Sequence, residues 1–211
     1  MKISRRACLK GFGAAMLLGL FGAGLAWREF GTPRLADLTG WTGFSPDDVS
    51  LLNEIAESIL PATDTPGAKA ADVGAFIATA VTECYEPQHQ AAFVAGLRAV
   101  ESMCLERYGR GFQNLTPDER TLLLSEVDGE RKWRELWNRS ERGLRVLARP
   151  VVGVLPAAVQ TPHFFTMMKD LTVMGYFTSQ PGATQALRHS AIPGDYNGSL
   201  PYRKGDRAWS I

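Results

Sequence analysis

Apolar residues recur at helical spacing along most of the chain, in stretches separated by proline and glycine. The first helix is predicted to begin at Ser45-Pro46, because serine caps a helix well and proline suits its first turn, and to end at Pro61. Its apolar face consists of Val49, Leu52, Ile55, Ala56, Ile59 and Leu60.

Two more helices are predicted after a compact turn at 61–68, where Pro66-Gly67 favours a tight turn. The second helix follows Asp72, and the third runs from Pro87 to Gly109. The apolar faces are Val73, Phe76, Ile77, Ala80, Val81 and Cys84 on the second helix, and Phe93, Leu97, Val100 and Cys104 on the third.

A fourth helix is predicted to start at Thr116-Pro117, since Thr116 and Glu119 have the spacing of a capping box. Its apolar face is formed by Leu122, Leu123 and Val127.

The chain is dense in charge from 128 to 149 and is predicted to form a solvated helix there, anchored by Trp133 and Trp137 one helical turn apart. Pro150 and Pro156 are predicted to bracket an apolar loop after it.

The stretch 162–179 is apolar on every side of a helix, with only Lys169 and Asp170 interrupting. Such a helix is buried on all sides. It is either the central core helix or a helix with one face against another subunit, where methionine and aromatic residues are common. Its apolar residues are Phe164, Phe165, Met167, Met168, Leu171, Val173, Met174, Tyr176 and Phe177.

Glycine and proline interrupt the last twenty residues too often for a helix, although Tyr196, Tyr202 and Trp209 lie among them. An aromatic tail without secondary structure needs a surface to lie on, either its own domain or a partner. With no alternating strand pattern and no internal repeat, the predicted fold is all-α, a single domain of about six helices. It comprises a linker at 27–44, a helical domain at 45–191 and an extended, irregular C-terminal tail at 192–211.

The first 26 residues have the order of an export signal: basic residues, a weakly hydrophobic run and small residues at the end. The pair Arg5-Arg6 makes it similar to a twin-arginine signal, with Cys8 where phenylalanine is usual. One alternative is an uncleaved anchor, but the sixteen residues from 11 to 26 span only about 24 Å as a helix, short of a bilayer core of roughly 30 Å. The other is a general secretory signal that contains the pair by chance.

Removing residues 1–26 leaves 185 residues with a net charge of −3, from 19 Lys and Arg against 22 Asp and Glu. This balance argues against binding to nucleic acid or anionic lipid. Cys84 and Cys104 then remain in an oxidising compartment, on successive helices and too far apart to pair. They are predicted to be buried free thiols; a bond to another chain is the alternative.

No local signature of catalysis, dinucleotide binding or metal binding is present. His89, His163 and His189 lie far apart without metal-ligand spacing, and Asp64 has the position of a turn former rather than a general base. We therefore predict no catalytic, cofactor-binding or metal residue in this chain. Because the twin-arginine route exports folded proteins, the economical interpretation is that the signal serves a second, cofactor-loaded protein.

The chain resembles subunit 3 of gluconate 2-dehydrogenase, the small subunit of periplasmic flavin-dependent sugar and polyol dehydrogenases. The similarity rests on the twin-arginine start, the segment 59–68 with Val73 and Phe76-Ile77 after it, the helix start at Thr116-Pro117, and the segments 175–179 and 193–198. It covers most of 45–200. Members often carry cysteine where this chain has Ser199, so a disulfide to another subunit is absent there.

The resemblance implies an accessory subunit that binds a large flavoprotein of the glucose-methanol-choline type, helps it mature and accompanies it to the periplasm. FAD would lie in that partner, and haem c in a possible third subunit, a membrane-bound multihaem cytochrome that would hold the complex at the membrane. The expected interface residues are Asp64, Pro66, Phe164, Phe165, Met168, Tyr176, Phe177, Tyr196, Tyr202 and Trp209.

Two other functions stay open on the sequence alone. A stand-alone periplasmic binding or membrane-anchored module would have a preformed apolar pocket. An enzyme in its own right would lose turnover when Asp64 or His163 is changed.

Overall fold

The computed structural model describes residues 41–152, 161–192, 194, 198–201 and 203–210, with the backbone alone for 137 and 140–152. The predicted export signal with Arg5 and Arg6, most of the linker, Pro156, Tyr196 and Tyr202 lie outside the described residues.

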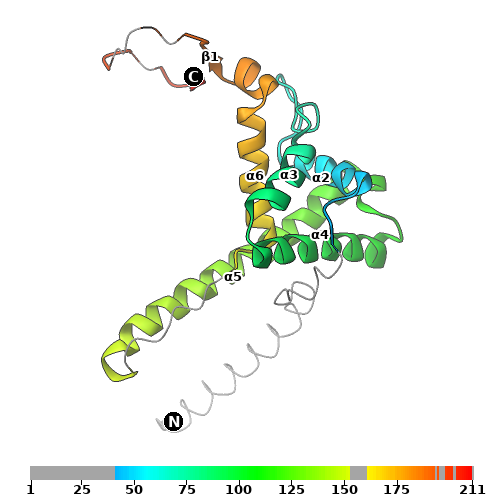
Figure 1. Ribbon diagram of the computed structural model, residues 1–211, viewed down its shortest axis with the longest axis vertical. Helices are drawn as coiled ribbons and strands as arrows, with labels where there is room; N and C mark the ends of the chain where they lie inside the picture. The colour runs from blue at the N-terminus through cyan, green and yellow to red at the C-terminus, as the bar shows by residue number, and fades with distance from the viewer. Residues whose placement is uncertain (1–40, 153–160, 193, 195–197, 202, 211) are drawn as a thin grey trace, which may run out of the picture.

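The described residues are mostly helical, which confirms the all-α prediction (Figure 1). The α-helices are α2 (Pro46–Ile59), α3 (Val73–Cys84), α4 (Pro87–Tyr108), α5 (Pro117–Val152) and α6 (Phe164–Thr178). Shorter elements are η2 (Phe112–Asn114), the π-helical turn η3 (Gly182–Ala186), and the two-residue strands β1 (Arg188–His189) and β2 (Trp209–Ser210).

Local signals set the helix ends where the sequence predicted them. Ser45 and Asp48 form a capping box at α2, and Thr116 and Glu119 bond reciprocally at α5. Gly109 ends α4 with a φ of 66°, a conformation that glycine adopts without steric cost.

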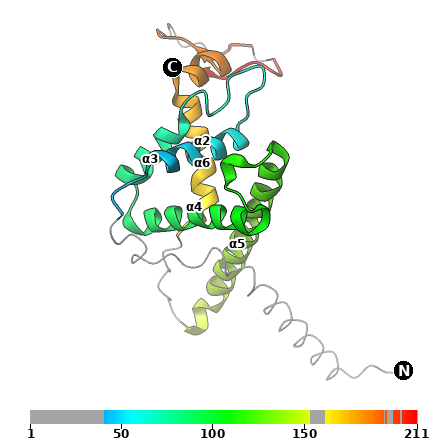
Figure 2. The same cartoon turned by 90° about the vertical axis from the view of Figure 1, so that its right-hand side faces the viewer.

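Helix α6 is the centre of the core and packs against α2, α3, α4 and α5 (Figures 1 and 2). The crossing with α4 is close: a Cβ on Gly96 would lie 2.1 Å from the Phe164 ring, so only glycine fits there. Phe93 meets Phe164 edge to face at 5.8 Å between ring centroids. The prediction of a central core helix is thus confirmed for one side of α6.

Four expectations about individual residues are wrong. Cys84 is exposed at the end of α3, whereas Cys104 is a buried free thiol as predicted, and burial raises its pKa to about 11. Leu122 is exposed, and Trp133 is 75% exposed, so Trp133 does not anchor α5 to the domain. Helix α5 also continues through Pro150 to Val152, because an internal proline, which removes one backbone hydrogen bond and crowds the preceding turn, can bend a helix without ending it.

Within the part of the chain that the structure describes, no helix combines the length and apolar character needed to cross a membrane.

Candidate partner-binding surface

Two of the segments on which the resemblance rests, 59–68 and 175–179, meet in the fold. The Tyr176 hydroxyl donates a hydrogen bond to the Pro66 carbonyl at 2.7 Å, across 110 positions of sequence. Tyr176 is itself buried. This contact ties the turn after α2 to the C-terminal half of α6.

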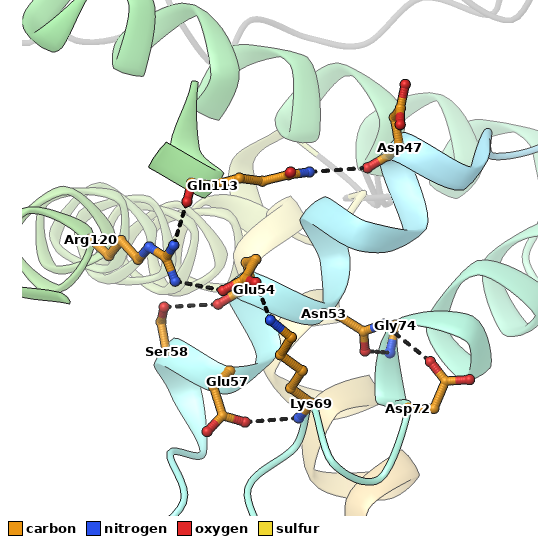
Figure 3. Close-up of polar contacts among 10 residues, drawn as sticks. All are labelled: Asp47, Asn53, Glu54, Glu57, Ser58, Lys69, Asp72, Gly74, Gln113 and Arg120. Carbon is orange, nitrogen blue, oxygen red and sulfur yellow. Dashed lines mark hydrogen bonds and ion pairs between the residues drawn. The ribbon is translucent and has the colours of Figure 1, made fainter. Parts of the chain in front are cut away.

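The carboxylate of Glu57, on α2, also fixes this turn in place. It accepts hydrogen bonds from the backbone N–H groups of Ala62 (2.9 Å) and Lys69 (2.8 Å), the second of which is drawn in Figure 3. A Cβ on Gly67 would lie 2.3 Å from both carboxylate oxygens, so the position needs glycine. The segment 61–69 is therefore a rigid loop fixed to α2.

Glu54 joins this loop to α5. Its carboxylate pairs with Lys69 and, at 2.6 Å, with Arg120, which also donates to the Gln113 carbonyl at 2.6 Å (Figure 3). Burial disfavours the charged form of Glu54, but the hydrogen bonds from Lys69 and Arg120 outweigh that effect and lower its pKa. These charged groups are structural, because they pair with one another and with a backbone carbonyl of the domain; only the buried Nε of Arg120 has no hydrogen-bond partner among their described contacts.

Asn53 fixes the crossing of α2 and α3. Its Oδ1 accepts from the Gly74 N–H at 2.7 Å and its Nδ2 donates to Asp72 at 3.1 Å (Figure 3). Asp72 has a φ of 49° and does not cap α3 with its own side chain. The two hydrogen bonds of Asn53 hold the chain in this left-handed conformation and thereby position Phe76 on the next turn of α3.

One side of the C-terminal half of α6 is uncovered. Val173, Met174 and Phe177 are 45%, 55% and 37% exposed and lie on adjacent turns, opposite Gly175, on which Phe76 packs. Figures 1 and 2 show α2, α3 and α4 on the other side of this helix. We call these three residues the outer stripe of α6. It is a contiguous apolar surface, of the composition found at interface cores.

His163, the candidate residue for an enzyme, caps α6. Its Nδ1 accepts from the Phe165 N–H at 3.1 Å, which requires the neutral imidazole. Burial, together with nearby Arg134 and Arg131, lowers the pKa of His163 to about 4. Among the described residues no group of three or more His, Cys, Asp or Glu side chains is placed to hold a metal ion.

Comparison with protein families matches residues 46–194 to the model of gluconate 2-dehydrogenase subunit 3. The chain belongs to this family. No curated protein and no solved structure matched it. The match starts at the first residue of α2 and includes the loop, the outer stripe and the first part of the tail. The family is named for a subunit of a dehydrogenase complex, so a surface that contacts another chain is expected on it.

The structure separates the expected interface residues of this family member into two groups. Phe164, Phe165, Met168 and Tyr176 are buried in the core and cannot reach a partner while the domain is folded. Asp64 is exposed at the tip of the rigid loop, and Pro66 is half-buried beside it. Phe177 and Trp209 are exposed. Val173 and Met174 were missed, because an all-round apolar helix does not show which side stays uncovered.

The end of the tail returns to the segment 188–189, at the end of the helical domain. Strand β2 pairs in parallel with β1, and Arg188 stacks 5.3 Å from the Trp209 ring while pairing with Asp206 at 3.2 Å. Figure 1 places this pair beyond the end of α6, away from α2, α3 and α4. Trp209 remains 53% exposed, so the tail presents an aromatic side chain on the same end of the molecule as Phe177.

Residue Phe44, at the end of the predicted linker, packs edge to face on Phe93 of α4 at 6.0 Å, and Trp41 packs on Phe44 at 5.3 Å. This confirms, for its described residues, that the linker lies against the domain. A groove of about 340 Å³ opens beside these rings, between α2 and α4, with Arg98 and Glu101 among its lining residues.

Proposed function

We propose that this chain is the non-catalytic small subunit of a flavin-dependent sugar or polyol dehydrogenase. It binds the large subunit, helps it mature and accompanies it through the twin-arginine translocase to the periplasm. The observation that carries the proposal is the family match over 46–194, together with an apolar stripe on α6 that this chain leaves uncovered.

The outer stripe supports binding to another protein chain. Val173, Met174 and Phe177 form part of one helix face, and the buried side of the same helix makes it rigid. A preorganised apolar face loses little conformational entropy on association, so its burial contributes to affinity. The exposed Asp64 loop is tied to this helix by the Tyr176–Pro66 bond and lies on the same rigid unit.

The chemistry is assigned to the partner in this proposal. FAD lies in a large subunit of the glucose-methanol-choline type, and a third, cytochrome c subunit at the membrane receives the electrons. The chain contributes binding surface, and Arg5-Arg6 contributes the export signal. A carrier of this signal is useful to an enzyme that must acquire its cofactor before export.

Purification of the tagged chain from its native host tests the proposal. We expect a larger polypeptide that carries flavin absorbance to co-purify from the periplasmic fraction, and export of both to fail when Arg5 and Arg6 are replaced by lysine. A soluble, monodisperse monomer without flavoprotein would contradict the proposal.

A matched pair of variants tests the surface. Met174→Glu with Phe177→Glu introduces charge into the outer stripe and is expected to abolish co-purification while leaving the fold intact. Leu122→Glu changes an exposed apolar residue of α5 and is expected to leave the complex unchanged. Equal loss in both variants would show that the stripe has no special role.

The second candidate, a stand-alone binding module, is favoured only by the groove between α2 and α4. It predicts that the chain functions without a partner and that a bound small molecule leaves the groove when the purified protein is unfolded.

A further inference from the structure

The second half of α5 projects from the domain. Helix α5 has 36 residues, and its contacts with α6 include the ion pair of Asp128 with Lys169 at 2.7 Å and the bond from Thr166 to Glu135. Beyond these contacts the helix runs away from α2, α3, α4 and α6 in both views (Figures 1 and 2). We call 129–152 the α5 arm; its first two turns still carry the contact of Glu135 with Thr166, and at 1.5 Å per residue it is about 36 Å long.

The arm has two chemically different faces. Its apolar residues recur at three- and four-residue spacing and therefore fall on one side of the helix. Trp133 is 75% exposed and Leu136 is 54% exposed, so the domain does not cover the start of this side. The apolar register positions are Trp133, Leu136, Trp137, Leu144, Leu147 and Val151.

Arginine dominates the other side. At 100° per residue, the positions around the opposite half of the helix include Arg134, Arg139, Arg142, Arg145 and Arg149, and also Arg131, which pairs with Asp128 and Glu135. The arm carries seven Lys and Arg against three Glu, a net charge of +4 in a chain whose residues 27–211 sum to −3. The small net charge of residues 27–211 is therefore the sum of a basic arm and an acidic remainder of the chain.

We propose that the α5 arm binds the surface of an anionic phospholipid membrane, lying in the plane of the headgroups. A strongly amphipathic helix of low overall hydropathy, with tryptophan and leucine on one face and arginine on the other, is the type that settles at this depth. Indole rings favour the interface, and long arginine side chains reach phosphate groups from a partly sunken helix. This position needs no helix that spans the bilayer.

Two other occupants fit the arm less well. A second copy of the chain would bring two arms of charge +4 together, along an apolar side that is interrupted by Ser140. A protein that contacts the apolar side would leave Arg139, Arg142, Arg145 and Arg149 on the far side of the helix. A helix that lies among the headgroups has lipid phosphates on both flanks. Arginines spread over half its circumference can therefore contact phosphate groups.

The test needs a local readout, because the N-terminal segment has the character of a membrane-seeking signal of its own. In the full-length variant Trp27→Phe, Trp41→Phe and Trp209→Phe, only Trp133 and Trp137 fluoresce. We expect phosphatidylglycerol vesicles with brominated acyl chains to reduce this emission about twofold or more. Phosphatidylcholine vesicles with the same brominated chains are expected to leave it unchanged.

Charge reversal on the arm supplies the matched comparison. Adding Arg142→Glu and Arg145→Glu is expected to remove the quenching. The control, Arg203→Glu with Lys204→Glu, changes the net charge equally at exposed positions in the tail and is expected to keep it.

Circular dichroism is the check on folding, and we expect it to show that both variants keep the helical content of the unaltered chain. The proposal is overturned if anionic vesicles cause no quenching, if the two reversals behave alike, or if the emission responds only to the co-purified flavoprotein. That last result would assign the arm to a protein partner and leave the proposed function standing.

Discussion

Single side chains in this protein act by forming hydrogen bonds with backbone groups at places where chain segments meet. Tyr176 and Glu57 both serve the loop after α2, one from α6 and the other from α2. Each bond contributes on the order of 1 kcal/mol to stability and fixes the position of the loop.

Tyr176→Phe should destabilise the domain by about 1 kcal/mol, since it removes the bond to the Pro66 carbonyl and keeps the ring. Urea unfolding measures the change. Tyr85→Phe is the control, because the Tyr85 hydroxyl makes no hydrogen bond to the described residues. Equal effects in both variants would show that the loop contact contributes nothing specific.

Gly67→Ala should lower stability by about 1–3 kcal/mol, because the new methyl group collides with a carboxylate held by two hydrogen bonds. Gly129→Ala, on α5, has open space around the new Cβ and should raise stability by up to about 1 kcal/mol through helix propensity. Thermal unfolding of the two variants checks the opposite signs.

His163 should make stability depend on pH between about 6.5 and 4. Its pKa is lower in the folded state than in the unfolded chain, so the unfolded chain binds more protons in this window and stability falls as the pH falls. Asp128, whose pKa is also lowered, adds a similar loss only below its ordinary value near 4. His163→Asn keeps a capping acceptor and should flatten the dependence between pH 6.5 and 4, which urea midpoints measured over this range would show.

At the scale of elements, α5 and α6 show how the same kind of apolar pattern has different outcomes. In α6 one side is buried by four neighbouring helices and the other forms the outer stripe. In α5 the first turns are buried through Leu123 and Val127, and the amphipathic pattern then continues along the arm beyond the domain. An amphipathic pattern predicts that a helix has an apolar face. It does not indicate whether the same domain, another protein or a membrane covers that face.

At the scale of the whole molecule, the helical domain and the tail are nearly independent. The tail contacts segment 185–190 through the β1–β2 pair, the Arg188–Asp206 ion pair and the bond from Arg207 to the Gln185 carbonyl. The core residues all belong to 51–176. The tail therefore adds surface rather than stability.

A chain truncated after residue 191 should unfold at the same temperature as the full chain, within about 2 °C, and with the same cooperativity. Differential scanning calorimetry measures both. If the tail stabilises the domain through contacts beyond 185–190, the truncated chain will unfold earlier. Its co-purification with the flavoprotein shows separately whether Trp209 contributes to binding.

Much of the fold was predictable because helix starts and ends depend on neighbours within four residues. Ser45 with Asp48, Thr116 with Glu119, and Gly109 each act within one turn, and all three were found where the pattern placed them. The candidate surface was less predictable. Whether Phe165 or Phe177 faces solvent depends on which helices pack against α6. Both are phenylalanines in a helix that is apolar on every side, so the sequence pattern does not distinguish them.

From its sequence alone, this chain was determined to be all-α, with helix boundaries set by local caps and breakers, and to belong to the gluconate 2-dehydrogenase subunit 3 family. Only the tertiary structure decided that Tyr176 reaches Pro66, that Cys84 and Trp133 are exposed, and that Val173, Met174 and Phe177 stay uncovered. The physical reason is range: capping acts within one helical turn, whereas burial is a property of contacts between segments far apart along the chain.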